Sequence, residues 1–249
     1  MCAAAAHAVA GDVVTLDGAE GRHAVTVQRR GAGERVDLVD GAGRRASSRI
    51  LSVQDGQLEA VVEVVTRDDD TPVALVQALA KGGRDEQAVE AAVELGVTAV
   101  TPWAADRSIV QWRGPKVAKG IASWQALCLA AAKQSRRAFV PTVEPLATTR
   151  ELAGRVRSAT ASGIRVLVLH EEAHAIITQL EWADASQEVW IVVGPEGGIS
   201  EDEIAALTDA GAVAVRLGPH ILRASSAGPA ALAAVAVMRG SWGSEQQPH

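Results

Sequence analysis

After residue 72 the sequence alternates short apolar runs with segments of helical periodicity, and this alternation is the strongest constraint on the fold. Each run has the length of one buried strand, and the segments between the runs carry apolar residues three and four positions apart. The predicted strands are 73–80, 97–101 (closed by Pro102), 164–169, 188–193 and 212–217, and the predicted helices are 84–95, 116–137, 148–158, 201–210 and 226–238. Strands separated by helices indicate an α/β domain with a parallel sheet that helices cover on both faces.

The first 70 residues have a different pattern, in which short β-branched runs are separated by glycines. The predicted strands are 13–16, 35–39, 45–53 and 58–65. Strands and turns at this spacing favour a small antiparallel barrel or sandwich. The acidic cluster at 68–70, followed by Thr71 and Pro72, indicates a linker. We therefore expect two domains, residues 1–70 and residues 71–249.

The composition argues against several classes of protein. The formal net charge of −6 over 249 residues argues mildly against a nucleic-acid partner, although the basic residues are mostly Arg and form doublets at 29–30, 44–45 and 136–137. Arg is well suited to bidentate phosphate contacts. Cys2 and Cys128 are too few and too far apart in sequence to indicate a disulfide framework or a metal site. No run approaches the roughly 18 apolar residues of a membrane span, and the first ten residues lack the basic region of a signal peptide. We expect a cytoplasmic protein without a metal.

The strongest local signal is the glycine-rich segment 194–200, Gly-Pro-Glu-Gly-Gly-Ile-Ser, which follows a predicted strand and precedes a helix. Ser200 and Glu203 have the spacing of a capping box, which marks the start of that helix. Glycines let a backbone approach a ligand closely, and ligands bind at the carboxyl ends of parallel strands. Neither the phosphate loop with its Lys nor the dinucleotide fingerprint is present. A plain strand-to-helix turn is the alternative interpretation.

Two further predicted strands end in segments of the same kind. Leu217-Gly218-Pro219 follows the strand at 212–217 and leads through Arg223 into a helix with a small-residue start, and His170 follows the strand at 164–169. Three strand ends that converge would form one pocket, whose apolar walls could hold an adenine while backbone groups bind its edges.

These segments, together with several upstream motifs, resemble the SPOUT-type methyltransferases. Within them, the sequence is similar to the RsmE family, which methylates N3 of a uridine (uridine 1498) in 16S ribosomal RNA. The motifs that carry the resemblance are 194–200 (GPEGGIS), 217–223 (LGPHILR), Lys81 with Arg84, 94–97 (ELGV), Pro102, 107–108 (RS), 134–137 (QSRR) with Pro141, 21–25 (GRHAV) and 39–41 (VDG). They occur in the family's order along nearly the whole chain.

The resemblance implies a PUA-like β-barrel that binds RNA (1–70), followed by a SPOUT α/β domain with a C-terminal trefoil knot (71–249). It also implies a homodimer and S-adenosyl-L-methionine as the cofactor. The implied cofactor-binding residues are Leu169, His170, Gly194, Pro195, Glu196, Gly197, Gly198, Leu217, Gly218, Ile221, Leu222, Ser225 and Ala227.

Methyl transfer to N3 of uridine requires loss of the N3 proton, and a fixed cation would stabilise the negative charge that develops on O2 and O4. Arg223 is the candidate for that cation, with a salt bridge or a surface position at a helix start as the alternative. Glu196 is a candidate proton acceptor, but we favour a role in organising its loop or the dimer interface, because a glutamate with an ordinary pKa is a weak base. For His170 and His220, packing or solvent exposure is the preferred interpretation.

The candidate RNA-binding residues come from both predicted domains. They are Arg22, Arg29, Arg30, Arg84, Arg107, Gln134, Arg136 and Arg137, which would contact the 16S ribosomal RNA of the small ribosomal subunit. Trp103 and Trp112 could stack a base, but burial in the core is the preferred interpretation.

The sequence departs from the family pattern at three places. Ala224, Ser225 and Ser226 stand where Thr and an acidic residue are common, Gly83 stands where Asp is common before Arg84, and the N-terminus is short. Three other functions stay open: a SPOUT enzyme for a ribose 2′-oxygen or another RNA, a non-catalytic RNA-binding or ribosome-assembly protein, and an enzyme that binds a small nucleotide.

Overall fold

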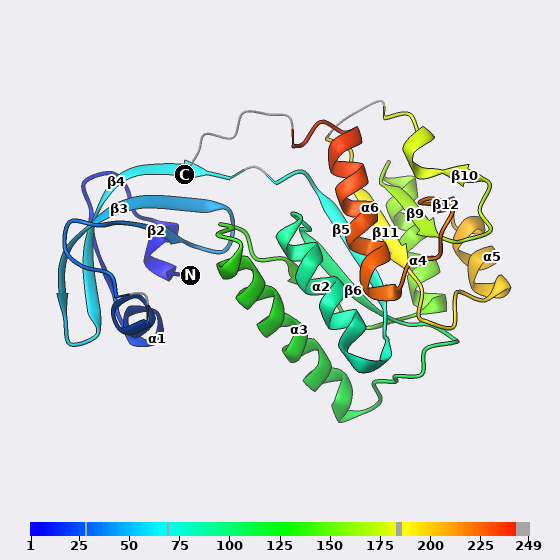
Figure 1. Ribbon diagram of the computed structural model, residues 1–249, viewed down its shortest axis with the longest axis horizontal. Helices are drawn as coiled ribbons and strands as arrows, with labels where there is room; N and C mark the ends of the chain where they lie inside the picture. The colour runs from blue at the N-terminus through cyan, green and yellow to red at the C-terminus, as the bar shows by residue number, and fades with distance from the viewer. Residues whose placement is uncertain (28, 69, 183–185, 243–249) are drawn as a thin grey trace. The chain divides into compact units, whose positions relative to one another are not determined.

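A computed structural model describes residues 1–27, 29–68, 70–182 and 186–242 (Figure 1). The chain divides into two units. The first comprises Met1–Asp70 and Ala132–Val140, and the second comprises Thr71–Ala131 and Pro141–His249. Asp69 of the acidic cluster lies outside the described residues.

The first unit is built on a four-stranded antiparallel sheet. All four predicted strands are present, as β1 (Val13–Leu16), β2 (Arg35–Val39), β3 (Arg44–Gln54) and β4 (Gln57–Arg67), in the order β1-β4-β3-β2. The β3–β4 hairpin turns on Asp55 and Gly56, which both have positive φ, as this tight turn requires. Within the described residues no ladder joins the edge strands β1 and β2. The antiparallel β domain is therefore confirmed, and its hydrogen-bonded sheet is open.

Short helical segments of the first unit escaped the sequence prediction. They are η1 (Ala3–Ala6), α1 (Gly18–Arg22) and the π-helical turn η2 (His23–Val27). Segments of four or five residues are too short to establish a helical hydrophobic period, which explains why they escaped notice.

A buried ion-pair network holds this unit together. Arg45 is only 4% exposed and donates to Asp68 at 2.6 Å, to Asp37 at 3.1 Å and to the Arg136 carbonyl at 2.9 Å. Arg137 donates to Asp70 at 2.7 Å. Asp68 and Asp70 are thus ion-pair partners of buried or half-buried arginines, a role that the sequence did not indicate, and the first segment of this unit ends at Asp70.

The second unit contains a parallel sheet, as predicted. Its strands are β5 (Val73–Ala78), β6 (Ala99–Ala104), β7 (Thr142–Val143), β8 (Ala147–Thr148), β9 (Arg165–Leu169), β10 (Ala175–Ile176), β11 (Val189–Val193) and β12 (Val213–Arg216). Its order is β10-β12-β9-β11-β5-β6-β7, and β8 also pairs with β6. The short strands β7, β8 and β10 were not predicted. The trefoil knot stays a prediction from the family resemblance.

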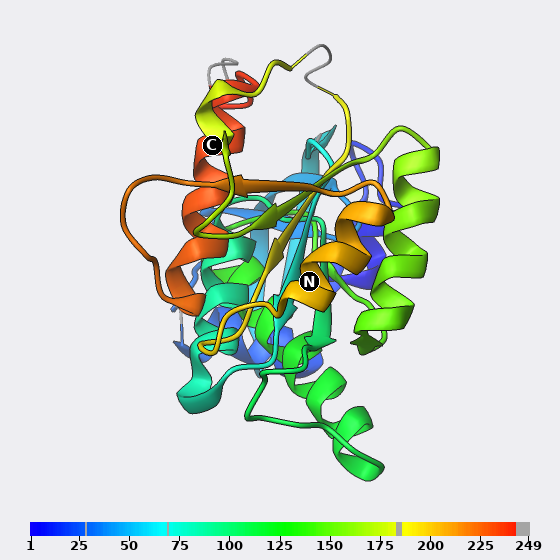
Figure 2. The same cartoon turned by 90° about the vertical axis from the view of Figure 1, so that its right-hand side faces the viewer.

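Helices cover both faces of this sheet. The helical segments that follow β5 along the chain are η3 (Lys81–Gly83), α2 (Arg84–Glu94), α3 (Pro115–Gln134), α4 (Thr149–Ala161), η4 (Ile177–Gln179), α5 (Glu201–Asp209) and α6 (Ala224–Met238). α2 packs against α6 on one face, and α4 packs against α5 on the other (Figures 1 and 2). Both Val192 and Val193 are buried, because consecutive side chains of a strand point to opposite faces and both faces are covered. The predicted capping box of Ser200 and Glu203 is confirmed at the start of α5.

Pro102 does not close its strand, contrary to the prediction. It lies inside β6, in register with Gln77 of β5. The carbonyls of Val100 and Trp103 accept bonds on opposite sides of β6, from Glu144 and Leu79 respectively. The backbone of Pro102 therefore faces the same edge of β6 as the backbone of Val100, which is the edge that pairs with β7 and β8. Pro102 lies at the gap between these two strands, so the N–H group that proline lacks is not needed for strand pairing.

Candidate cofactor and RNA site

The carboxyl ends of three neighbouring strands define the candidate site. β12, β9 and β11 are adjacent and parallel, so the loops that follow them leave the same edge of the sheet. The backbone N–H of His170, just after β9, donates to the carbonyl of Val215 in β12 at 2.9 Å. Figure 2 shows the loop after β12 bending back into α6. The topology thus brings together the three segments that the sequence predicted would converge.

The loop after β11 needs its glycines for packing within the protein. A Cβ on Gly194 would lie 2.5 Å from Cγ1 of the buried Ile199, and a Cβ on Gly197 would lie 3.0 Å from Cβ of Arg107. Gly198 has φ +74, and its N–H donates to the Pro195 carbonyl at 2.9 Å. The plain-turn interpretation therefore accounts for these glycines, whether or not a ligand also approaches them.

Glu196 connects this loop to the start of α2. Its Oε1 accepts hydrogen bonds from Nη1 of Arg84 at 2.8 Å and from the backbone N–H of Lys81 at 3.1 Å. Burial by itself would raise the pKa of Glu196, but hydrogen bonds from its own backbone, from Arg84 and from Lys81 outweigh burial and lower the pKa below its ordinary value. Glu196 is thus an ionised acceptor that is already engaged within the protein.

Arg107 holds the same loop from the other side. Its Nη1 donates to the Gly197 carbonyl at 3.2 Å. Two arginines that the sequence assigned to RNA, Arg84 and Arg107, therefore both contact the glycine loop. Each of the two arginines can orient this loop through its present contact. If Arg84 also bound RNA, its positive charge would be shared between Glu196 and a phosphate.

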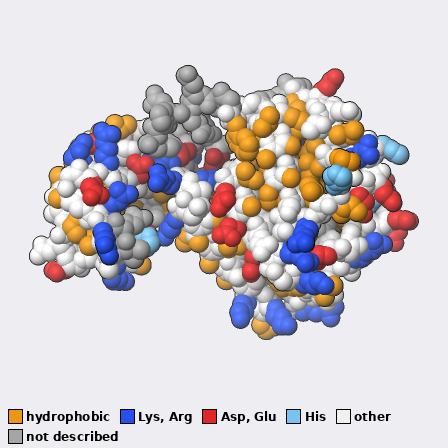
Figure 3. Space-filling view, in the orientation of Figure 1, with side chains coloured by type: hydrophobic (Ala, Val, Ile, Leu, Met, Phe, Trp, Pro, Cys, Tyr) orange, Lys and Arg blue, Asp and Glu red, His pale blue; other side chains and the backbone are white. Residues whose placement is uncertain are grey.

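The loop between β12 and α6 is open to solvent. Ile221 is 82% exposed, and Gly218 has no atom within 4 Å of a Cβ built on it. An open backbone with exposed apolar side chains fits a bound adenosine, which needs backbone contacts and apolar walls. Figure 3 shows hydrophobic side chains gathering over α6, and Leu222 and Val237 are exposed in the loop and the helix respectively.

Arg223 is the N-cap of α6. Its carbonyl accepts the N–H groups of Ser226 at 2.8 Å and Ala227 at 2.9 Å, while its side chain makes no cap. In the described part of the chain no carboxylate lies within ion-pair distance of its guanidinium, and the residue is exposed. The half-buried Leu169 and His170 lie across the same edge of the sheet, and Nδ1 of His170 accepts the Glu172 N–H at 3.3 Å.

The other predicted RNA-binding residues belong to the first unit. They differ in solvent exposure and in whether an ion pair already engages their side chains. Arg22 lines a shallow groove with Ala19, His23 and Thr26, and Arg29 is exposed with φ +53. Arg30 makes an exposed contact with Glu34 at 3.4 Å. Gln134 and Arg136 are exposed at the end of α3 and just after it. Arg137 is bound to Asp70 with a side chain only 10% exposed, so its guanidinium stabilises the unit and is poorly placed for RNA.

Both tryptophans considered for base stacking pack against other residues of the protein. Trp103 is fully buried, and its Nε1 donates to Oγ1 of Thr149 at 3.2 Å. Trp112 is half-buried against Gly120, where an added Cβ would lie 2.6 Å from its ring, and it meets Trp124 edge-on at 5.5 Å. Core packing is confirmed for Trp103, and the ring of Trp112 packs against Gly120 of α3.

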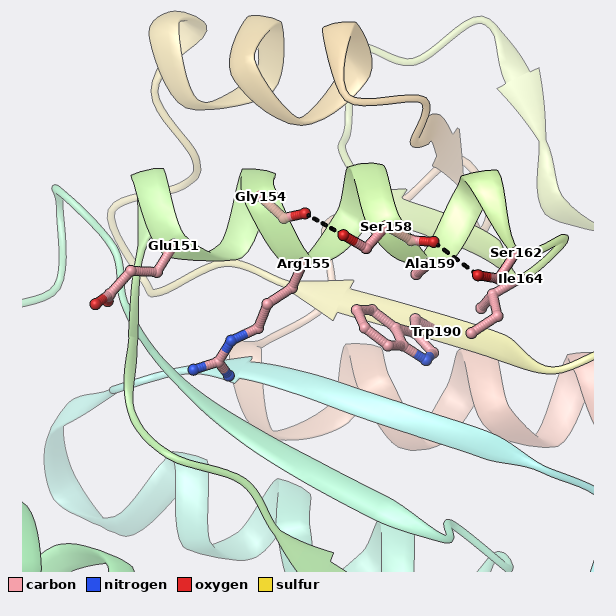
Figure 4. A pocket seen from close by; sticks show the side chains of 8 residues that line it. All are labelled: Glu151, Gly154, Arg155, Ser158, Ala159, Ser162, Ile164 and Trp190. Carbon is pink, nitrogen blue, oxygen red and sulfur yellow. Dashed lines mark hydrogen bonds between the residues drawn. The ribbon is translucent and has the colours of Figure 1, made fainter.

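A groove that the sequence analysis missed lies beside α4 (Figure 4). Gly154, Ser158 and Ser162 line it at a four-residue spacing, with Arg155 and the Trp190 indole beside them. This spacing of small residues is the signal that could have indicated it. The groove lies on the face covered by α4, whereas α6 packs on the opposite face.

No described helix is long and apolar enough to cross a membrane. A search of the described residues found no cluster of three or more His, Cys, Asp or Glu side chains that could hold a metal ion.

Comparison with known proteins identifies the family. The sequence model of the RNA methyltransferase domain family matches residues 67–236. The sequence model of the RNA methyltransferase PUA domain family matches residues 16–63. Ribosomal RNA small subunit methyltransferase E of Mycobacterium tuberculosis is 47% identical over 236 residues, which cover 93% of this chain and 89% of that protein. The chain belongs to the ribosomal RNA small subunit methyltransferase E family.

Other members of this family agree along the chain. The Bacillus subtilis protein of the same name is 29% identical over 89% of this chain and 88% of its own length. The crystal structure of the Neisseria gonorrhoeae protein, bound to S-adenosyl methionine, superposes with a TM-score of 0.82 at 30% identity and covers 93% of this chain and 94% of that one. The predicted family, α/β fold and PUA domain are thereby confirmed.

The contacts of Glu196 predict a pH-dependent stability. Because its pKa is lowered in the folded protein, the stabilisation is fully present above the ordinary glutamate pKa and is lost as the pH falls through the lowered folded value. At pH 7 we expect Glu196→Gln to lower the free energy of unfolding by at most about 1 kcal/mol, since the pair is partly exposed. Urea denaturation at a series of pH values checks this.

The control for this measurement is Glu90→Gln, which changes an exposed carboxylate of α2 that forms no ion pair among the described residues. We expect no pH-dependent difference for it. A gap between wild type and Glu196→Gln that stays constant from neutral to acidic pH would contradict the assignment.

Proposed function

We propose that this chain transfers the methyl group of S-adenosylmethionine to N3 of uridine 1498 in 16S ribosomal RNA. The observation that carries the proposal is the full-length similarity to ribosomal RNA small subunit methyltransferase E, at 47% identity, with both domain families present. The loop between β12 and α6 supports it, because it offers open backbone beside the exposed Arg223. The reaction takes place in the cytoplasm, where ribosomal subunits are assembled.

The loops after β9, β11 and β12 would hold the cofactor. The backbone around Leu217, Gly218 and Leu222 would bind the adenine, and residues 194–198 would lie on the opposite side of the cofactor. When bound there, S-adenosylmethionine supplies an electrophilic methyl group on a positively charged sulfur. The contribution of the protein is chiefly to place N3 in line with that methyl group, since positioning alone supplies much of the acceleration.

Arg223 stabilises the charge of the reacting uridine. Loss of the N3 proton to water leaves a negative charge that spreads over N3, O2 and O4 of the base, and this charge is neutralised as the bond from N3 to the methyl carbon forms and the bond from that carbon to sulfur breaks. A guanidinium without a carboxylate partner is free to donate to these oxygens. Glu196 organises the loop and does not act as the base, because its lowered pKa makes it a weak base and its Oε1 already accepts two hydrogen bonds.

The RNA is bound by arginines of both units. Arg22, Arg29, Arg30 and Arg136 are the better candidates in the first unit, because Arg137 is held by Asp70. Arg84 and Arg107 contribute near the glycine loop. The base must be unpaired, because only then is its Watson–Crick edge accessible.

The active form is a homodimer. The exposed apolar side chains of Ile221, Leu222 and Val237 lie in the cofactor loop and on α6, where a second copy would cover them. Full activity of a strictly monomeric protein in sedimentation measurements would contradict this assignment.

Labelled S-adenosylmethionine and small ribosomal subunits that lack the modification test the reaction. We expect label in 16S RNA and a reverse-transcription stop at the modified uridine, because an N3-methyl group blocks base pairing. Label without a stop would indicate a ribose 2′-oxygen as the acceptor, and a stop elsewhere would indicate another target. Cofactor binding without label in any RNA would refute the enzyme function.

Replacing Arg223 by Ala tests its role in the transition state. We expect kcat to fall about 100-fold, the size of effect seen when one stabiliser of a developing charge is removed. The Kd for S-adenosylmethionine, measured by calorimetry, should change by no more than about twofold, because the uridine charge is absent from the cofactor complex.

Arg157→Ala is the matched control, since Arg157 is an exposed arginine of α4 on the other face of the sheet. It should leave both quantities unchanged. Equal losses of kcat and cofactor affinity in Arg223→Ala would reassign Arg223 to cofactor binding.

A further inference from the structure

Glu203 is a buried glutamate in the first turn of α5. It is 1% exposed, and its Oε2 accepts the backbone N–H of Ser200 at 3.0 Å, which is the capping-box contact. A capping box needs only one oxygen of its glutamate. The other oxygen, Oε1, is therefore available for contacts that the start of the helix does not require.

Oε1 of Glu203 joins two further segments to α5. It accepts the backbone N–H of Asp106, just after β6, at 2.8 Å. It also accepts the hydroxyl of Thr149, the first residue of α4, at 2.8 Å. The Thr149 hydroxyl itself accepts Nε1 of the buried Trp103 at 3.2 Å. Removal of this carboxylate would leave several partly buried donors without a partner, which is costly.

The segment that Glu203 anchors after β6 is the one that carries Arg107. In the sheet β5 lies between β6 and β11, so the chain after β6 must reach past the end of β5 to meet the glycine loop after β11. The bond from the Asp106 N–H fixes the residue directly before Arg107. Arg107 in turn packs its Cβ against Gly197 and donates from Nη1 to the Gly197 carbonyl at 3.2 Å.

One buried carboxylate thus acts on the glycine loop at two points. Its Oε2 binds Ser200 at the end of the loop, and its Oε1 reaches Gly197 through Asp106 and Arg107. Gly197 and Gly198 are among the residues that the family resemblance assigns to the cofactor. The direction in which their backbone faces a ligand therefore depends on a group that lies beneath the loop.

We propose that Glu203 is a positioning residue for the cofactor site, whose carboxylate holds residues 106–107 and the glycine loop in the arrangement that binds S-adenosylmethionine. Glu203 itself contacts neither the cofactor nor the RNA. The inference rests on the proposed function, which assigns the loop after β11 to the cofactor.

Replacing Glu203 by Met tests this role, because Met keeps the length of the side chain and removes both oxygens. The arrangement that binds the cofactor is then populated for only part of the time, and the apparent Kd rises by the inverse of that fraction. We expect the Kd for S-adenosylmethionine, measured by calorimetry without RNA and well below the Tm, to rise about three- to tenfold, the factor that one hydrogen bond is worth. At saturating cofactor kcat should stay within about twofold of wild type, because the bound cofactor restores the arrangement.

Hydrogen–deuterium exchange without cofactor follows the contact itself. The Asp106 N–H donates to Glu203, and the Gly198 N–H donates to the Pro195 carbonyl inside the glycine loop. Both amides should exchange at least about threefold faster in Glu203→Met, because the bond that holds the two segments is lost.

Glu151→Met is the matched control. Glu151 is the capping-box glutamate at the start of α4, and the hydrogen bonds that its carboxylate accepts in the described part of the chain come from Thr148 alone. This variant removes the same kind of helix cap and releases no other segment. It should leave the Kd for S-adenosylmethionine and the exchange of Asp106 and Gly198 unchanged.

A double-mutant cycle with Arg107→Ala tests the route from Glu203 to the loop. Arg107 is exposed, so the variant removes the bond to the Gly197 carbonyl and leaves the core intact. We expect Arg107→Ala to raise the Kd for S-adenosylmethionine at least about twofold, and the double variant to be no worse than Glu203→Met.

A wild-type Kd in Glu203→Met, an equal rise in Glu151→Met, or additive losses in the cycle would overturn the proposal. If Glu203→Met does not fold, Arg107→Ala decides: a raised Kd with faster exchange of Gly198 supports the proposal, and a wild-type Kd overturns it. If the wild-type protein binds the cofactor but methylates no RNA, the proposed function fails, and the Kd measurements still decide the role of Glu203. A wild-type protein that binds no cofactor would overturn both.

Discussion

The parallel pairing of β11 between β9 and β5 is the constraint on which the rest of the second unit depends. This pairing inserts a late strand into the middle of the sheet and buries both its faces. It also sets the glycine loop at 194–198 beside the loops that follow β9 and β12. Three segments that lie far apart in the sequence meet at one edge because their strands are neighbours and point the same way.

Close packing then determines which residues at this edge of the sheet tolerate substitution. Gly194 and Gly197 leave no room for a side chain, because Ile199 and Arg107 occupy the space beside them. Gly218 lies in open space and imposes no such limit within the protein. The two glycine-containing loops thus have different physical roles: one is a tightly packed turn, and the other is open backbone on which a cofactor can lie.

Charge is used for architecture as well as for recognition. Arg45 and Arg137 are anchored by Asp37, Asp68 and Asp70 in the first unit, and Arg84 is paired with Glu196 in the second. The arginines in these ion pairs are therefore less available to bind phosphate.

The sequence by itself determined the long strands, the order of helices, the capping box at Ser200 and the family, because hydrophobic periodicity and ordered motifs are local properties of the chain. Pro102 shows the limit of this reasoning, since only the gap between β7 and β8 reveals why a proline is tolerated inside β6. The partners of Asp68, Arg137 and Glu196, and the bonds from Asp106 and Thr149 to Glu203, were decided only by the tertiary structure. A hydrogen bond or an ion pair depends on which distant residues share a space, and no spacing along the chain encodes that distance.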